Sequence, residues 1–444
     1  MSLRSLLAAV LIGAAACAQA ATELVIATVD NGPMIEMQRL SRHFEQANPD
    51  IRLKWVTLDE GTLRKRVTDD IASRGGAFDI MTIGLYETPI WGAKGWLQPL
   101  EPDASYDAED LVPFIREGLT IGGKLYAAPF YGESSMLMVR RDLLGAAGLD
   151  MPNRPTWAHV RAVAERLHDP AKGVYGICLR GRPGWGDNMA LVTTIANSFG
   201  GQWFDTAWQP RLTSEPWRRA VSLYVELLTR FGPPQPENLS FNELLGLFSA
   251  GRCAMWLDAT IAAATLTDPK RSSVARHVSF AQVPTGVTSR GANWLWAWSL
   301  AIPASSRQAA AARRFVLWAT SKDYVRLVAR ESGWSRVPSG TRKSTYGSLD
   351  YLASSRSATA ELQALHSADL KLPTLPRSPY TGIQFVAIPE FQDIGNAVGR
   401  HVADALAGRQ TVDAALAAAQ QAAQQGMAAG ATAKLAARHA GASR

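Results

Sequence analysis

The stretch that decides the fold is ELVIATVDNGPMIEMQRLSRHFEQANPDIRLKWVTL, residues 23–58. Its two ends, 23–29 and 51–58, are rich in β-branched residues and predict strands. The segment between them spaces its apolar residues as a helix does, with Pro33 at a first-turn position. A helix over 62–76 and a strand over 78–84 follow. Strands that alternate with helices in this way predict parallel pairing and an α/β sheet.

The same alternation returns later in the chain. A helix over 157–169 precedes a strand over 174–180, and a helix that turns into a strand occupies 241–258. A tryptophan-rich strand near 294–303 is followed by a helix over 307–332. The chain has 444 residues, of which 47% are hydrophobic and 19% charged, so we expect more than one globular domain.

The first twenty residues have the composition of a secretory signal. Arg4 precedes an apolar run over 6–16, and Ala-Gln-Ala ends the segment at residue 20. The run is shorter than the roughly 20 residues that span a bilayer. We therefore expect an exported protein, cleaved after Ala20. Because Ala14 stands three places before Cys17, where lipid-attachment sites carry a larger aliphatic residue, we do not expect lipid at Cys17.

The net charge of +7 does not predict a nucleic-acid partner. The densest basic cluster, LRKR at 63–66, is followed at once by Asp69 and Asp70, and we interpret these charges as surface groups. Export would allow a disulfide between Cys178 and Cys253, and two buried thiols fit the sequence equally well.

Polar and aromatic residues stand where several predicted strands end. They are Asn31, Tyr86 with Glu87, Trp185 with Asn188, and Asp258. Ligands of open α/β sheets bind beyond the carboxyl ends of the strands, so these residues are candidate ligand contacts.

Each of these candidates also has a purely structural interpretation. Asn31 and Asp258 precede helices that they could cap, and Glu87 could be a solvated loop carboxylate. In the pair Asp187-Asn188 we expect Asp187 to cap the helix and Asn188 to contact a ligand. Tyr131 could belong to the core.

Trp294, Trp296 and Trp298 alternate along the chain, so in a strand their indoles project from one face. Such a row can form a flat wall against weakly apolar ligand surfaces, although we expect at least one indole to serve packing alone.

Catalytic and cofactor signatures are weak. There is no nucleophile elbow, phosphate loop or dinucleotide glycine pattern, and His159 and His168 have no partners for a metal site. We expect no cofactor, no metal and no enzymatic activity. Glycoside cleavage by Glu87 and Asp258 is retained as an alternative.

Several segments resemble one family closely. The stretch GGKLYAAPFYGESSMLMVRRDLLGAAGLDMPNRPTWAHV (122–160) resembles the signature region of the family 1 extracellular solute-binding proteins of ABC importers. Segments 184–190, 255–263, 294–303, 332–342 and 379–395 are similar to the branch of that family that binds polyols. Asp30-Asn31-Gly32 and LMVRRD (137–142) depart from the pattern of that branch, which leaves the ligand open among mannitol, sorbitol and arabitol.

The resemblance implies a periplasmic binding-protein fold of two α/β lobes with a hinge and a ligand cleft between them. Lobe 1 would hold 21–129 and 284–334, lobe 2 would hold 130–283 and 335–430, and 431–444 would be a frayed tail. Asn31, Glu87 and Trp296 would face Trp185, Asn188, Asp258 and Gln384 across the cleft, with Tyr86 and Tyr131 completing the site.

The implied function is capture of a sugar alcohol in the periplasm and its delivery to an ABC permease by a monomer. Binding of an oligosaccharide or monosaccharide, or a secreted carbohydrate-active enzyme, are the alternatives.

Overall fold

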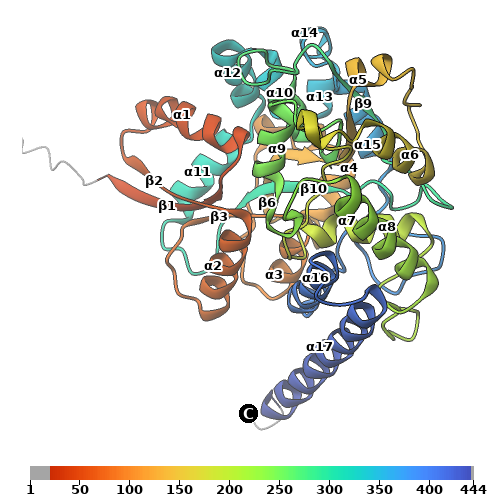
Figure 1. Cartoon of the computed structure of the whole chain (residues 1–444). Coiled ribbons are helices and arrows are strands. Elements are labelled where there is room, and N and C mark those ends of the chain that lie inside the picture. The colour runs from red at the N-terminus through yellow and green to blue at the C-terminus, as the bar shows by residue number, and fades with distance from the viewer. Residues whose placement is uncertain (1–20, 442–444) are drawn as a thin grey trace, which may run out of the picture.

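The computed structural model describes the backbone of residues 21–441 and the side chains of residues 21–430. The predicted signal peptide and Cys17 lie outside the described residues. The chain begins with β1 (Thr22–Val29), α1 (Gly32–Ala47), β2 (Ile51–Leu58), α2 (Glu60–Ser73) and β3 (Ile80–Ile83). β1 pairs in parallel with both β2 and β3, and α1 and α2 lie on opposite sides of these strands (Figure 1). The predicted strand–helix alternation is confirmed.

Two further strands complete this sheet from distant parts of the chain. Its order is β2-β1-β3-β10-β6, where β6 is Ala127–Glu133 and β10 is Trp296–Ala301. β10 lies between β3 and β6 and is antiparallel to both. The tryptophan-rich strand is therefore a central strand of the N-terminal sheet.

A second sheet has the order β8-β7-β9, formed by β7 (Ser135–Arg140), β8 (Met255–Ala259) and β9 (Val278–Ala281). Only Ser134 separates β6 from β7, so the chain passes from one sheet to the other at this residue. It returns to the first sheet between β9 and β10. Each sheet is covered by its own helices, which gives the molecule two α/β halves (Figure 1).

The remaining elements are mostly helices that cover the two sheets. They are α3 (Glu87–Ala93), α4 (Pro113–Gly118), the small β4 (Thr120–Ile121) and β5 (Lys124–Leu125) pair, α5 (Arg141–Ala146), α6 (Trp157–Leu167), α7 (Asn188–Ser198), α8 (Glu215–Phe231), α9 (Phe241–Ser249), α10 (Ala263–Leu266), α11 (Ala309–Ala319), α12 (Lys322–Ser332), α13 (Lys343–Tyr346), α14 (Leu349–Ser354), α15 (Ala358–Ser367), α16 (Phe391–Leu406) and α17 (Val412–Gly441).

Two local predictions differ from the structure. The segment 174–180 makes only isolated bridges, at Val174, Tyr175 and Cys178, where a strand is predicted. At Gly176 the backbone runs so close to α6 that an added Cβ would lie 2.1 Å from the Ala164 carbonyl oxygen, and a glycine at such a close approach weakens a strand. The predicted helix over 307–332 is divided into α11 and α12, because the Ser321 side chain caps α12.

Cys178 and Cys253 form a disulfide, which decides between the two alternatives left by the sequence. The bond ties the segment before Arg180 to the segment that leads into β8. Both residues are fully buried among apolar side chains.

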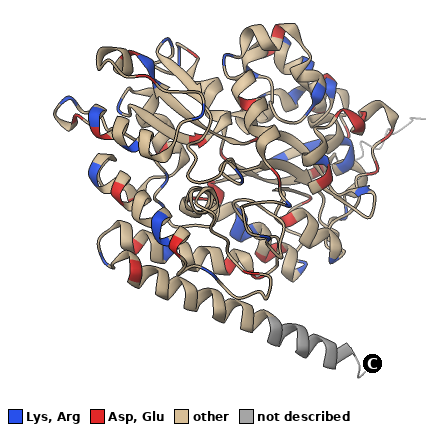
Figure 2. Cartoon of the chain, turned by 90° about the vertical axis from the view of Figure 1, so that its right-hand side faces the viewer, with Lys and Arg blue, Asp and Glu red and all other residues tan. Residues whose placement is uncertain are grey.

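None of the described helices has the length and apolarity needed to cross a bilayer. Lys and Arg are interspersed with Asp and Glu over the helices (Figure 2). α17 projects away from the body (Figure 1) and runs to Gly441, so it includes most of the segment 431–444.

Candidate ligand-binding site

A cleft between the two halves contains two connected compartments. The inner compartment encloses about 30 Å³ and is lined by four indoles, those of Trp185, Trp294, Trp296 and Trp298. The middle compartment encloses about 210 Å³. The two share Glu60, Glu133, Arg180 and Trp298 in their walls. The whole tryptophan row therefore faces one cavity, and among its three indoles only that of Trp298 lines both compartments.

The indoles are held by one another and by a guanidinium. The Trp296 ring lies 5.7 Å from that of Trp185 and 5.6 Å from that of Trp298. It also covers Gly84, where an added Cβ would lie 2.0 Å from an indole carbon, so glycine is needed here. The Arg64 guanidinium lies 4.1 Å from the Trp185 ring and 4.7 Å from each of the Trp296 and Trp298 rings, within range of cation–π attraction.

Two glutamates fix Arg64 in this position. Arg64 Nη1 donates to Glu87 Oε1 at 2.6 Å, and Glu60 Oε1 accepts from Arg64 Nη2 at 3.0 Å. The other Glu87 oxygen accepts from the Gly84 backbone N–H at 2.9 Å. Glu87 is buried and ion-paired, so its interpretation as a solvated loop carboxylate is wrong.

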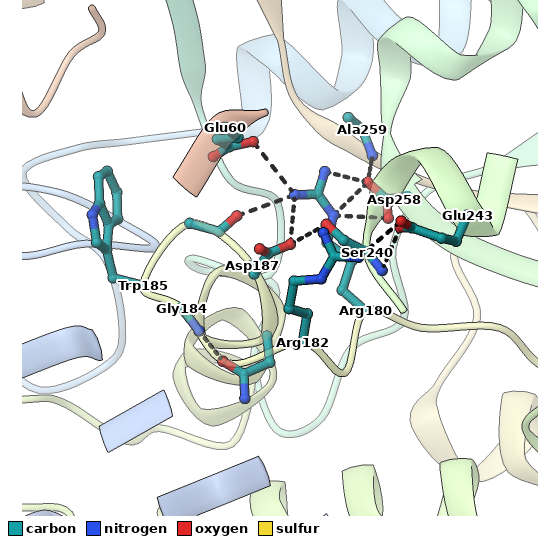
Figure 3. Close-up of polar contacts among 12 residues, drawn as sticks. Glu60, Arg180, Arg182, Gly184, Trp185, Asp187, Ser240, Glu243, Asp258 and Ala259 are labelled. Atoms are coloured by element: carbon teal, nitrogen blue, oxygen red, sulfur yellow. Dashed lines mark hydrogen bonds and ion pairs between the residues drawn. The ribbon is translucent and has the colours of Figure 1, made fainter. Parts of the chain in front are cut away.

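A second buried ion pair, between Arg180 and Asp258, lies on the opposite side of the cleft from Arg64 and Glu87 (Figure 3). Asp258, in β8, is fully buried and accepts from Arg180 Nε at 3.0 Å and Arg180 Nη2 at 2.7 Å. It also accepts from Trp256 Nε1 and from the Ala259 backbone N–H. Asp258 therefore does not cap a helix, and it lines neither compartment. Its effect is to hold Arg180, which lines both.

Arg180 makes weaker contacts with the other carboxylates of the cleft. Its Nη1 donates to the Gly186 carbonyl oxygen at 3.1 Å and lies 4.0 Å from Glu60 Oε2 and 3.9 Å from Asp187 Oδ1. Figure 3 shows this guanidinium between Glu60, Asp187 and Asp258. A single cation thus links acidic groups from both halves of the molecule.

Among the described residues, Glu133 is the one buried carboxylate of the cleft that has no hydrogen-bonding or ionic partner; Asp30, which also lacks one, is exposed. It is the last residue of β6, lies opposite Trp296 on β10, and is 7% exposed. Burial raises the pKa of Glu133 to about 8; the nearby Arg180 lowers it, and Glu60 and Asp258 raise it further. A carboxyl group of this pKa keeps its proton near neutrality, so it can both donate and accept a hydrogen bond.

Asn31 and Tyr131 lie side by side in the wall of the middle compartment. Asn31 Oδ1 accepts from the Met34 backbone N–H and caps α1, while Asn31 Nδ2 donates to the Tyr131 hydroxyl oxygen at 3.0 Å. The capping interpretation of Asn31 is confirmed, and the same side chain still reaches the cavity wall.

Tyr86 lies outside the two compartments. Its hydroxyl donates to the Ile388 carbonyl oxygen at 3.0 Å and accepts from the Gln392 backbone N–H at 3.2 Å, at the beginning of α16. Its ring packs 5.0 Å from that of Trp185. Tyr86 thus connects α3 with α16 and supports Trp185 from behind.

Asn188 and Gln384 have amides that are bonded to the protein's own backbone. Asn188 Oδ1 accepts from the Gly184 N–H, and Nδ2 donates to the Gly399 carbonyl oxygen, so the amide is committed away from the cleft. Asp187 makes no capping bond to α7; it accepts from Ser240 and lines the middle compartment. The expected division, with Asp187 as the cap and Asn188 facing the ligand, is wrong. Gln384 holds both backbone groups of residue 295 and lines the inner compartment.

Residues 27–326 match the family model of the bacterial extracellular solute-binding proteins. The chain belongs to this family. A mannitol-binding protein of Pseudomonas aeruginosa is 51% identical to this solute-binding protein over 421 residues, which are 95% of this chain and 96% of the relative.

Solved structures of solute-binding proteins share the fold. One from an ABC transporter of Agrobacterium vitis, with bound D-mannitol, is 51% identical, matches with a TM-score of 0.91 and covers 92% of this chain and 99% of that one. One from Agrobacterium radiobacter, in complex with ribitol, is 26% identical with a TM-score of 0.80, and covers 92% of this chain and 99% of that one. The predicted α/β fold of two lobes with a cleft between them is confirmed.

Four polar residues of the cleft were missed by sequence reasoning: Glu60, Arg64, Glu133 and Arg180. Arg180 and Glu133 end the segments 174–180 and 127–133, so the strand-end rule that selected Asn31 could have selected them. Arg64 was interpreted as part of a surface cluster, and this is wrong, because it is 7% exposed and lies beneath three indoles.

The enzyme alternative requires Glu87 and Asp258 to act as acid and base on a bound ligand. Each of these carboxylates is paired with an arginine, and neither lines the inner or the middle compartment. Within residues 21–430, no three His, Cys, Asp or Glu side chains are grouped so as to hold a metal ion.

Proposed function

We propose that this solute-binding protein captures a sugar alcohol of the mannitol type in the cleft and delivers it to an ABC permease. The observation that carries the proposal is the Glu133 carboxyl group, which is buried, has no hydrogen-bonding or ionic partner among the described residues and lines both compartments beside the indoles. The 51% identity to a structure with bound D-mannitol supports the same ligand class.

The polar groups of the cleft suit hydroxyl groups. Each hydroxyl of an alditol both donates and accepts, and burying one without a partner costs about 1–3 kcal/mol. Arg180 donates, a protonated Glu133 donates and accepts, and Asn31 with Tyr131 offers a further polar edge. Most other carboxylates of the site already have arginine partners, so the ligand we propose is neutral.

The indole wall suits the carbon skeleton of the same ligand. The C–H groups left between the hydroxyls of an extended alditol are weakly apolar and can lie against an aromatic face without needing a hydrogen-bond partner. Trp298 is the indole we propose for this contact, because it lines both compartments. The Trp296 ring packs against Trp298 and against Trp185, and Gln384 holds the backbone between Trp294 and Trp296.

We propose that lobe 1 holds 21–133 with 284–334 and that lobe 2 holds 135–283 with 335–430. The position of β6 in the first sheet favours this first crossing at Ser134, a few residues after the boundary at 129 that the resemblance implies. Arg180 and Glu60 come from different lobes in this division, so ligand contacts could favour the closed form by hinge motion. We propose a monomer that works in the periplasm after removal of its signal peptide.

A thermal-shift panel followed by calorimetry tests the proposal. Alditols, monosaccharides and disaccharides are compared, because a ligand that binds only the folded state raises the melting temperature by mass action. We expect mannitol or a related alditol to give the largest shift, and calorimetry to give a dissociation constant near micromolar, about −8 kcal/mol. A panel in which no alditol raises the melting temperature contradicts the proposal.

A pair of tryptophan variants locates the site. Trp298→Ala should lower alditol affinity at least tenfold in the fraction that remains folded, because it removes the wall common to both compartments. Trp96→Ala is the matched control: its indole packs near Lys94, away from the cleft, and the variant should bind as the parent does. Equal loss in both variants would count against the assignment.

A further inference from the structure

The cleft continues beyond the two compartments of the proposed site. An outer compartment of about 350 Å³ adjoins the middle one. The two share five lining residues, Asp30, Asn31, Phe241, Asn242 and Ile261. The two compartments therefore lie side by side along the cleft, and the side chains common to both are the boundary that a longer ligand would pass.

The outer compartment has a polar floor built from buried side chains. Glu361 is 4% exposed and accepts from Ser357 Oγ at 2.6 Å and from the Tyr351 hydroxyl at 3.3 Å. Burial raises the pKa of Glu361, and its hydroxyl partners lower it. Several further serine and threonine hydroxyls stand in the same lining. Such groups donate and accept at short range, as a hydroxylated ligand requires.

The charges of this lining do not select an ion. Arg336 lies 3.8 Å from Asp268, and Glu36 is paired with Arg39 at 2.6 Å. Asp30 and Arg271 add one charge of each sign. Apolar surface from Phe241 and Leu245 completes the wall. Hydroxyls, balanced charges and an aromatic edge together fit a neutral sugar ring.

The volumes of the three compartments indicate which part of a ligand lies in which compartment. The inner compartment, about 30 Å³, has room for about one or two water-sized groups and so admits only the end of an open chain. The middle one has 210 Å³, and the outer one, with 350 Å³, is larger than either. The open-chain end of a ligand therefore fits the inner compartment beside the indoles, and a bulkier unit fits the outer compartment.

On the basis of the proposed function, we infer that the ligands include alditols that carry a glycosyl substituent. The open-chain alditol end lies against Glu133 and the indoles, and the glycosyl ring occupies the outer compartment between Phe241 and the floor around Glu361.

Maltitol, a glucosyl-sorbitol, and sorbitol itself are the probes. Calorimetry with the full mature chain should show that maltitol binds within tenfold of sorbitol. Ala264 lines only the outer compartment, so Ala264→Trp should fill it. We expect this variant to lose at least tenfold in maltitol affinity and to keep sorbitol affinity within twofold, while the control Ala264→Ser binds both as the parent does.

Three results would overturn the inference. The first is a parent protein that binds sorbitol and not maltitol. The second is a loss of both affinities in equal measure in Ala264→Trp. If Ala264→Trp does not fold, Ser354→Trp on the exposed rim of the same compartment replaces it, with the same expected results. The third is a parent that binds no alditol of either kind, which contradicts the proposed function as well and is thereby distinguished from the first two.

Discussion

Glu133→Gln should change how stability depends on pH. The usual pKa of a glutamate in the unfolded chain is near 4.5, and in the folded protein the pKa of Glu133 is about 8. Between these values the folded state holds a proton that the unfolded state has released, so the free energy of unfolding falls as pH rises. At 1.36 kcal/mol per pKa unit, this group should remove about 2–3 kcal/mol between pH 5.5 and pH 7.5. Glutamine keeps the shape and cannot ionise.

Urea unfolding of the ligand-free protein at pH 5.5, 6.5 and 7.5 measures the effect. The free energy of unfolding of Glu133→Gln relative to that of the parent should rise across this range by about 2–3 kcal/mol. Glu215→Gln is the control, because Glu215 is exposed on α8 and should leave the parent's slope unchanged. Parallel curves for the parent and Glu133→Gln would refute the reasoning, since the carboxyl group would then titrate in the same way in both states.

Three further variants test the supports of the cleft. Asp258→Ala leaves Arg180 buried without its ionic partner and should lower the free energy of unfolding by about 3–5 kcal/mol in urea titrations. The double variant Cys178→Ala, Cys253→Ala releases a loop whose ends are 75 residues apart, and calorimetric melting should show that its free energy of unfolding is lower by about 4 kcal/mol. Reducing agent should lower the free energy of unfolding of the parent by the same amount and leave that of the double variant unchanged. Tyr86→Phe removes only the hydroxyl that joins α3 to α16, and should cost about 1 kcal/mol in urea unfolding while the circular dichroism spectrum stays the same.

The fold could be predicted from local pattern to a considerable extent. The alternation in residues 23–84 is decided by strand and helix periodicity that lies close together in the chain, and the structure confirms it. The insertion of β10 between β3 and β6 could not be found in this way, because antiparallel pairing across more than 160 residues leaves no local signal. The resemblance to a known family implied only that this strand returns to lobe 1, and its place between β3 and β6 comes from the structure.

The candidate site shows where sequence reasoning stops. Position at a strand end selects a residue without saying what its side chain binds. Asp258 and Glu87 lie near the ends of strands, as expected, but the carboxylate of each is already paired with an arginine. Arg64 looks like a surface residue in LRKR because the one-dimensional pattern does not reveal that three indoles from elsewhere in the chain will cover it.

The place of β10 has a consequence for how the protein is made. This strand occupies an interior position of its sheet, yet it starts only at Trp296 of a 444-residue chain. During synthesis β3 and β6 emerge long before the strand that joins them, so both keep an open hydrogen-bonding edge while the chain grows. The N-terminal half therefore cannot lock into its final form until about two thirds of the polypeptide has been translated.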